Sequence, residues 1–445
     1  MQAQPREIDT LIEAHWVIPV EPDGVVHEDH AVAIDDGRIL DLLPSGEARA
    51  RYRARTIREL PDHVLIPGLV NAHTHAAMTL LRGLADDLPL MRWLKEHIWP
   101  AEARWVGAEF TRDGTQLAMA EMLRGGTTCF NDMYFFPDVV ARAASACGMR
   151  ACVGLIVIDF PSAWAADWEE YLSKGLALHD RYRGDPLIRT AFAPHAPYSV
   201  GDAALARIRT LSDELDLPVH MHVHETADEV RRSEQEHGMR PLQRLHALGL
   251  VSPALLGVHM TQLTEDEIGL LAETGAQVIH CPESNLKLAS GFCPVERLAR
   301  AGVNVALGTD GAASNNDLDL LGETRSAALL AKAVAGDAAA LPAARALRMA
   351  TLNGARALGL GEEIGSLEPG KAADLVAVDL GELETEPVYH PISQLIYAAG
   401  RHQVTDVWVA GRALLEERVL TTLDPIPVRE RARAWRARIA ATDPE

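Results

Sequence analysis

Eight short apolar segments recur along the chain, and a stretch with helical character separates each one from the next. They lie at 64–70, 127–130, 151–158, 188–193, 219–223, 255–258, 277–279 and 304–307. Apolar segments of this length that alternate with helices are typical of parallel strands buried on both faces. Eight such units close a (β/α)₈ barrel, so the sequence predicts an α/β fold with a TIM-like barrel over 66–365.

Both ends of the chain carry short strand patterns with turn signals instead. These patterns lie at 10–60, 364–378, 404–409 and 412–414. The pair Asp36-Gly37 between apolar segments is typical of a β-hairpin. Because chain termini often lie close together, we expect residues 1–65 and 366–445 to form one small composite β-sandwich domain. An Arg-Ala pattern predicts a helix at 429–441 that packs on the outside of the protein.

Two histidines one residue apart, His73 and His75, follow the first apolar segment. Successive side chains of a strand point to opposite faces, so these two imidazoles project to the same side, about 7 Å apart along the chain. A lone His-x-His pair is more often a cap on a buried strand than a metal site. Here the pair stands at the carboxyl end of a predicted barrel strand, where α/β enzymes keep their chemistry.

Five further predicted strands also end in histidine or aspartate. Their ends carry His195, then His220, His222 and His224 on one strand, His259, His280 and Asp310. Unpaired buried polar groups cost about 1 to 3 kcal/mol each, so packing explains this gathering poorly. A metal bound by histidine and carboxylate explains it and favours catalytic zinc, with iron or manganese as alternatives. His73, His75 and Asp310 are candidate ligands, and spacing alone does not choose the third histidine.

Charge and cysteine content limit which partners the protein can bind and in which cellular compartment it functions. The chain has 63 acidic and 42 basic residues, a formal charge of -21. This excess disfavours nucleic acids and anionic membranes and favours a neutral or cationic small molecule. Five cysteines without a C-x-x-C pair indicate buried thiols in a reducing compartment, so we expect a cytoplasmic protein. The sequence leaves the oligomeric state open and allows a homo-oligomer.

Longer motifs cover nearly the whole chain. They are PGLVNAHTH at 67–75, LADDLPL at 84–90, IWPAE at 98–102, APH at 193–195, HVHET at 222–226, HCPESN at 280–285 and GTDG at 308–311. Together they resemble the amidohydrolase superfamily, and within it the 5-methylthioadenosine/S-adenosylhomocysteine deaminase family. The segments ending in Glu102 and His195 are the more specific ones.

The resemblance implies a metal site. In the family, a ligand histidine stands three residues before a catalytic glutamate, which fits His222 and Glu225. The implied ligands of one Zn²⁺ per chain are then His73, His75, His222 and Asp310. Two-metal relatives carry a carbamylated lysine at the end of strand four, where this chain has histidine, so we expect a single metal.

The resemblance also implies how the reaction proceeds. A metal lowers the pKa of water to about 7, which provides hydroxide to attack C6 of an adenine ring. Glu225 then protonates N1, while His259 orients or helps to deprotonate the water and Asp310 accepts a proton. We expect Glu102 and His195, with Glu225 and Asp310, to hold the substrate, and Trp93 to wall the pocket.

We therefore expect a zinc-dependent aminohydrolase that converts 5′-substituted adenosines to inosine analogues and ammonia. Candidate nucleosides are 5′-methylthioadenosine, S-adenosylhomocysteine and adenosine. The nearest alternative is a hydrolase of triazines or a deaminase of a free base such as guanine on the same metal site, and a third is a non-catalytic barrel. Glu102 discriminates between the enzymes, because a carboxylate that accepts from ribose hydroxyls has no partner in a free base.

Overall fold

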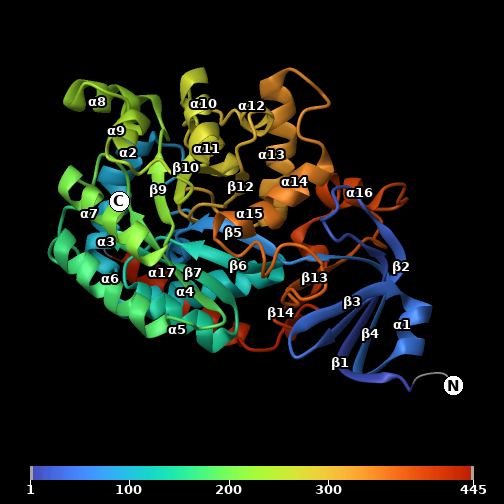
Figure 1. Cartoon of the computed structure of the whole chain (residues 1–445). Helices are drawn as coiled ribbons and strands as arrows, with labels where there is room; N and C mark the ends of the chain where they lie inside the picture. Colours follow the sequence, from blue (N-terminus) through green and yellow to red (C-terminus); the bar gives the residue numbers. More distant parts are fainter. Residues whose placement is uncertain (1–3, 442–445) are drawn as a thin grey trace.

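The computed structural model describes residues 4–441 and contains two eight-stranded sheets. The first sheet has its strands in sequence order, all parallel to their neighbours, and forms the barrel in Figure 1. Its strands are β5 (Leu69–Thr74), β6 (Thr127–Asp132), β7 (Arg150–Val157), β8 (Ile188–Pro194), β9 (Val219–Val223), β10 (Leu255–His259), β11 (Gln277–His280) and β12 (Val305–Leu307). The predicted barrel is confirmed.

Helices follow the barrel strands and surround them (Figure 1). They are α4 (Ala108–Arg124), α5 (Pro137–Cys147), α6 (Trp168–Tyr182), α7 (Asp202–Leu215), α8 (Ala227–His237), α9 (Pro241–Ala247), α10 (Glu265–Thr274), α11 (Pro282–Lys287), α12 (Val295–Arg300), α13 (Leu320–Ala335), α14 (Ala343–Met349) and α15 (Leu352–Ala357). Within residues 4–441, every helix is too short or too polar to cross a lipid bilayer.

The barrel closes where its first and last strands meet, directly beneath the site. The backbone nitrogen of Asp310 donates to the carbonyl oxygen of His73 over 3.0 Å. Gly308 permits this approach, because a Cβ there would lie 2.7 Å from Cβ of His73. Two of the three motifs that carry candidate ligands, 67–75 and 308–311, are thereby joined.

The second sheet takes strands from both ends of the chain, as predicted (Figure 1). Its order is β16-β15-β14-β13-β4-β1-β2-β3, and all neighbours are antiparallel except β1 and β4. The elements are β1 (Arg6–Val17), β2 (His27–Asp35), β3 (Arg38–Pro44), α1 (Ser45–Arg51), β4 (Tyr52–Pro67), β13 (Leu375–Asp379), β14 (Val404–Val409), β15 (Arg412–Glu416) and β16 (Val419–Leu420).

This mixed sheet curls so that the turn between β2 and β3 meets the turn between β14 and β15. The backbone nitrogen of Ala373 donates to Gly37 in the predicted Asp-Gly turn, and Gly411 donates to Ala373. Ile34 of β2 and Trp408 of β14 belong to one buried cluster, although three strands separate their strands in the sheet. The division into a barrel at 66–365 and a composite domain from 1–65 and 366–445 stays our proposal.

The first apolar segment divides between the two sheets, which the sequence pattern did not predict. Val64 and Ile66 lie in β4 and pair with Val378 and Val376 of β13. The barrel strand that carries His73 begins only after Gly68, where the chain crosses from one sheet to the other. A Cβ at Gly68 would lie 2.0 Å from the Thr128 hydroxyl, so the crossing requires glycine.

The segment after β5 covers one side of the barrel mouth. It contains η1 (Ala76–Leu81), α2 (Leu90–Trp93), η2 (Leu94–Ile98) and α3 (Trp99–Trp105). The remaining elements are α16 (Pro391–Tyr397), η3 (Arg401–Gln403) and α17 (Pro425–Ala440). The last of these is the predicted C-terminal helix, and its Trp435 packs against Phe110 of α4 with ring centroids 5.3 Å apart.

Candidate active site

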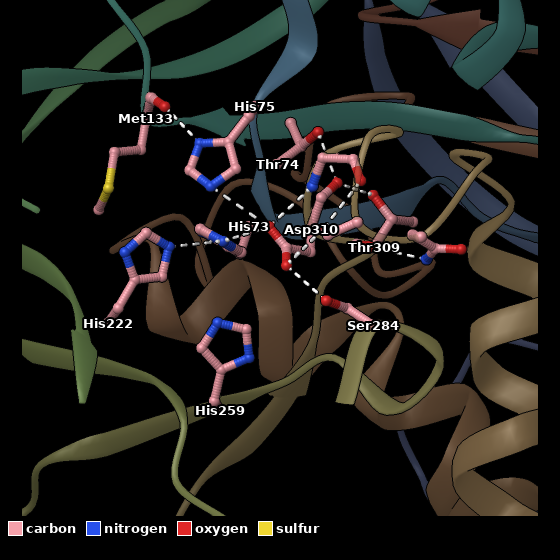
Figure 2. Close-up of polar contacts among 12 residues, drawn as sticks. His73, Thr74, His75, Met133, His222, His259, Ser284, Thr309 and Asp310 are labelled. Atoms are coloured by element: carbon pink, nitrogen blue, oxygen red, sulfur yellow. Dashed lines mark hydrogen bonds and ion pairs between the residues drawn. The ribbon is translucent and has the colours of Figure 1, made fainter. Parts of the chain in front are cut away.

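Four side chains meet at the carboxyl ends of β5, β9 and β12. One ligand atom from each of His73, His75, His222 and Asp310 lies within 4.8 Å of the others. Both His73 and His75 place Nε2 at 3.2 Å from Oδ1 of Asp310. The Nε2 atoms of His73 and His222 are also 3.2 Å apart. Figure 2 shows the imidazoles gathered around the aspartate.

The outer ring nitrogens fix how these histidines face the centre. Nδ1 of His75 donates to the carbonyl oxygen of Met133, and Nδ1 of His222 donates to that of His195 over 2.8 Å. Since a carbonyl can only accept, the proton of a neutral imidazole must sit on Nδ1, and the lone pair on Nε2 points inward. Nδ1 of His73 lies 2.8 Å from Nε2 of His220.

This donor set fits a divalent metal. Three imidazole nitrogens and one carboxylate oxygen are the ligands that catalytic zinc prefers, and they lie in a buried cluster. Burial lowers the pKa of His75, but the Asp310 carboxylate raises it more, to about 9. Asp310 thus draws one positive charge into the cluster, which a metal would supply on displacing the proton.

Asp310 is held rigidly by groups outside the cluster. Its Oδ2 accepts hydrogen bonds from the hydroxyls of Ser284, at 2.6 Å, and Ser314, at 2.8 Å. Burial raises its pKa, but its imidazole partners outweigh burial and hold the pKa well below the ordinary range. Asp310 is therefore an ionised carboxylate with one oxygen anchored and one oxygen directed at the histidines.

The three alternating histidines of β9 take different positions. His220 contacts His73, whereas His222 joins the cluster. His224 follows the end of the strand with φ of 55°, and its Nε2 accepts from the backbone nitrogen of Leu242. The period of two therefore does not extend to His224.

A cavity of about 820 Å³, including its open mouth, lies over the cluster. Its walls include Glu225 and His259, predicted to be catalytic, and Glu102, His195 and Trp93, predicted to hold or wall the substrate. Such a volume suits a nucleoside-sized ligand.

Glu225 has the properties of a proton donor. Burial raises the pKa of Glu225 to about 8, and the negative charge of Asp310 contributes to the same shift. Its backbone nitrogen donates to Oε2 of Glu229 over 2.7 Å, and that of His224 donates to Oε1 over 3.1 Å. Glu229 thus braces the turn that carries Glu225.

His259 faces Glu225 across the cavity. Its Nε2 lies 3.9 Å from Oε2 of Glu225, and its Nδ1 lies 2.9 Å from the amide oxygen of Asn285. Because an amide oxygen only accepts, Nδ1 carries the proton and Nε2 of the neutral ring is a base. Burial lowers the pKa of His259, which keeps the ring neutral.

The remaining predicted residues line the same cavity with defined partners. Glu102 accepts a hydrogen bond of 2.8 Å from the Tyr134 hydroxyl, and burial raises the pKa of Glu102 to about 7. His195 pairs through Nδ1 with the Ser199 hydroxyl at 2.8 Å. Trp93 is buried and donates from its indole to the backbone of Ala85.

The sequence reasoning did not identify several supporting residues. Ser284 and Asn285 stand within the HCPESN motif, so their proximity to His280 could have drawn attention to them. Tyr134 and Glu229 carry no such signal, because their roles depend on contacts with Glu102 and with the turn after β9.

Comparisons with known proteins agree with this geometry. The sequence profile of the amidohydrolase family matches residues 64–414. A 5-methylthioadenosine/S-adenosylhomocysteine deaminase of Teredinibacter turnerae is 53% identical over 434 residues, which are 98% of each chain.

Solved structures match over almost the whole chain as well. An adenosine deaminase from Xanthomonas campestris with bound zinc has a TM-score of 0.98 and 60% identity, covering 99% of this chain and 100% of that one. The atrazine chlorohydrolase TrzN from Arthrobacter aurescens, with zinc, has a TM-score of 0.90 but 24% identity, covering 96% and 99%, and shares the fold. This chain belongs to the amidohydrolase family and, within it, to the 5-methylthioadenosine/S-adenosylhomocysteine deaminases.

Proposed function

We propose that this protein is a zinc-dependent aminohydrolase that deaminates 5′-substituted adenosines to their inosine analogues and ammonia. The observation that carries the proposal is one cavity that holds the cluster, Glu225 with a pKa raised to about 8, and the Glu102 carboxylate. The full-length relatives with deaminase names support the same reaction. The substrates would be 5′-methylthioadenosine, S-adenosylhomocysteine or adenosine.

His73, His75, His222 and Asp310 would hold the zinc ion. When bound, zinc lowers the pKa of water from near 16 to about 7 and so supplies a nucleophile at neutral pH. The anchoring of Asp310 by two serine hydroxyls supports this assignment, because it engages Oδ2 and leaves Oδ1, which also accepts from the backbone nitrogen of Gly311, facing the cluster.

Glu225, His259 and Asp310 would move the protons. Glu225 is protonated at neutral pH, so it can donate to N1 of adenine and make C6 electrophilic. The free Nε2 of His259 or the Asp310 carboxylate can accept one proton from the attacking water. As the C6–N bond breaks, the ionised Glu225 can take back a proton from the new C6 hydroxyl. A proton returned to the exocyclic nitrogen then lets ammonia leave.

Glu102 and His195 would position the nucleoside. The Glu102 carboxylate can accept from the ribose hydroxyls, and the Tyr134 hydroxyl orients it from behind. The second ring nitrogen of His195 is available to the base, since its Nδ1 is engaged by Ser199. Trp93 would add an apolar wall to the same cavity.

Ammonia release from a panel of purified substrates, with chloride release as the readout for the chloro-triazine, tests the proposal. The panel contains adenosine, 5′-methylthioadenosine, S-adenosylhomocysteine, guanine, adenine and a chloro-triazine. We expect turnover of the adenosines and little of the free bases. Inertness toward every adenine nucleoside, with turnover of a free base or triazine, would replace the proposal by the alternative.

We also propose a cytoplasmic location and retain the homo-oligomer as a prediction. All five cysteines are buried free thiols, which favours a reducing compartment. Fractionation of the native cells tests the location, and light scattering of the purified protein tests the oligomeric state.

A further inference from the structure

A second hollow adjoins the catalytic cavity. The two share Trp99, Glu102, Phe135 and Phe160 in their walls. The second hollow, here called the side pocket, has a volume of about 1110 Å³ including the space open to solvent at its rim. Its remaining walls are Ala103, Val106, Phe136, Pro161, Ser162 and Ala163.

The walls of the side pocket are almost entirely apolar. They come from α3, from the connection before α5 and from the connection before α6, and the rings of Trp99 and Phe160 lie 6.5 Å apart. Phe160 is 44% exposed and lines both hollows.

The side pocket offers little to a charged ligand. Among the described residues that line it, none is a lysine or arginine, and Glu102 is its single acid. The Ser162 oxygen already accepts from the Tyr171 hydroxyl at 2.6 Å and from the backbone nitrogen of Trp164. Lys174, which donates to the Trp164 carbonyl beyond this loop, is paired with Glu170 over 2.8 Å.

We propose that the side pocket binds the 5′ substituent of the nucleoside and selects uncharged thioethers over the zwitterionic amino-acid group of S-adenosylhomocysteine. This inference rests on the proposed function. In a nucleoside the ribose stands between the base and the 5′ group. With the base over the cluster and the ribose at Glu102, the 5′ group therefore extends beyond Glu102, where the side pocket lies.

Two consequences follow for specificity. An apolar 5′ group gains from burial against aromatic rings, whereas a carboxylate and an ammonium lose hydration without finding partners. The volume of the side pocket also leaves room for groups larger than methylthio. Trp93, which lines the catalytic cavity and not the side pocket, is not needed for this selection.

A matched pair of substrates tests the proposal in the zinc-loaded enzyme. We compare kcat/KM for 5′-butylthio-5′-deoxyadenosine and S-adenosylhomocysteine, which share a chain of similar length but differ in charge. The butylthio compound should be as good as 5′-methylthioadenosine and better than S-adenosylhomocysteine by at least about tenfold. Equal values for the pair, or strong rejection of the butylthio group, would overturn the proposal.

Variants of Ala103 provide a second test, because this exposed residue lines the side pocket but not the catalytic cavity. Ala103→Arg places a cation near the amino-acid carboxylate and should raise kcat/KM for S-adenosylhomocysteine about three- to tenfold relative to the butylthio compound. Ala103→Gln, of similar length but neutral, should leave the ratio unchanged. No shift with arginine would contradict the proposed position of the 5′ group.

Adenosine and 5′-methylthioadenosine separate this inference from the function on which it rests. If both are deaminated but the kcat/KM ratios differ from those expected, the specificity proposal is wrong and the proposed deaminase function is kept. If neither is deaminated, the proposed function itself fails.

Discussion

The two ends of the barrel bury charged groups in opposite ways. At the amino end of β7, Arg150 donates two hydrogen bonds, of 3.0 and 3.1 Å, to Asp374 just before β13. Asp374 also accepts from the backbone nitrogen of Ala410, so the charges of the pair satisfy each other and join barrel to composite sheet. This pair is complete without any ligand.

The carboxyl end of the barrel is incomplete by the same standard. Nε2 of His73 and Nε2 of His75 each lie 3.2 Å from Oδ1 of Asp310, and Nε2 of His73 and Nε2 of His222 face each other at 3.2 Å. Unpaired buried donors and acceptors cost free energy, so a cluster of them indicates a bound group. The buried ion pair at the amino end therefore has a structural role. At the carboxyl end, the polar atoms that converge without complete pairing identify the site.

The largest expected effect comes from changing Asp310, the one acid of the cluster. Asp310→Asn supplies a weaker ligand and no proton acceptor, so kcat/KM should fall by about 10⁴-fold or more. Elemental analysis should show one zinc per chain in the native protein and less in the variant. Circular dichroism should stay unchanged, because the Arg150 pair is untouched. Two metals per chain in the native protein would show that the site has been misassigned.

Glu225→Gln separates proton transfer from metal binding. The amide can hydrogen-bond N1 but cannot protonate it, so activity should fall by about 10² to 10⁴ while zinc content is kept. A loss smaller than about tenfold would reassign the proton donor.

The pKa of Glu225 also predicts a pH profile. With burial raising this pKa to about 8, the donor is protonated below that pH and loses its proton above it. We therefore expect kcat/KM to decline as the pH rises through about 8. A profile that stays flat well above this pH would contradict Glu225 as the acid.

Arg150→Met tests the architectural half of the comparison. It leaves the Asp374 carboxylate buried and unpaired, which should lower the free energy of unfolding by about 3 to 5 kcal/mol in urea titrations. The folded fraction should keep its kcat/KM within about twofold. Adding Asp374→Asn removes the uncompensated charge and should recover part of the stability. An equal loss of activity and stability would mean that the two ends of the barrel are coupled.

The sequence predicted the eight repeated barrel strands better than the positions at which individual strands begin and end. All eight barrel strands were expected, because burial on both faces leaves an apolar pattern. The segment 64–70 was predicted to be one barrel strand, and this was wrong. The chain passes from one sheet to the other at Gly68, although the apolar pattern continues through it. His224 departs from its strand for a similar reason, since the backbone turns at the strand's end.

The candidate site could be predicted only as far as its motifs reach. His73, His75 and Asp310 follow from their positions at strand ends, and His222 required the family resemblance. Tyr134 could not be foreseen, because its contact with Glu102 joins residues on separate segments.

A smaller catalytic loss than for Asp310 or Glu225 is expected for Glu102, which belongs to both the catalytic cavity and the side pocket. If its carboxylate accepts from the ribose hydroxyls, Glu102→Ala removes charge-assisted hydrogen bonds worth roughly 1.5 to 3 kcal/mol, about ten- to 150-fold in kcat/KM. A 2′,3′-dideoxy analogue lacks those hydroxyls, so the same substitution should cost it much less. Tyr134→Phe is the control, since it removes only the hydroxyl that orients Glu102 and should have a smaller effect. An equal loss for the parent nucleoside and the dideoxy analogue would mean that Glu102 has a structural role, with Tyr134 as its hydrogen-bond partner, as Asp374 has with Arg150. That result would also strengthen the free-base alternative.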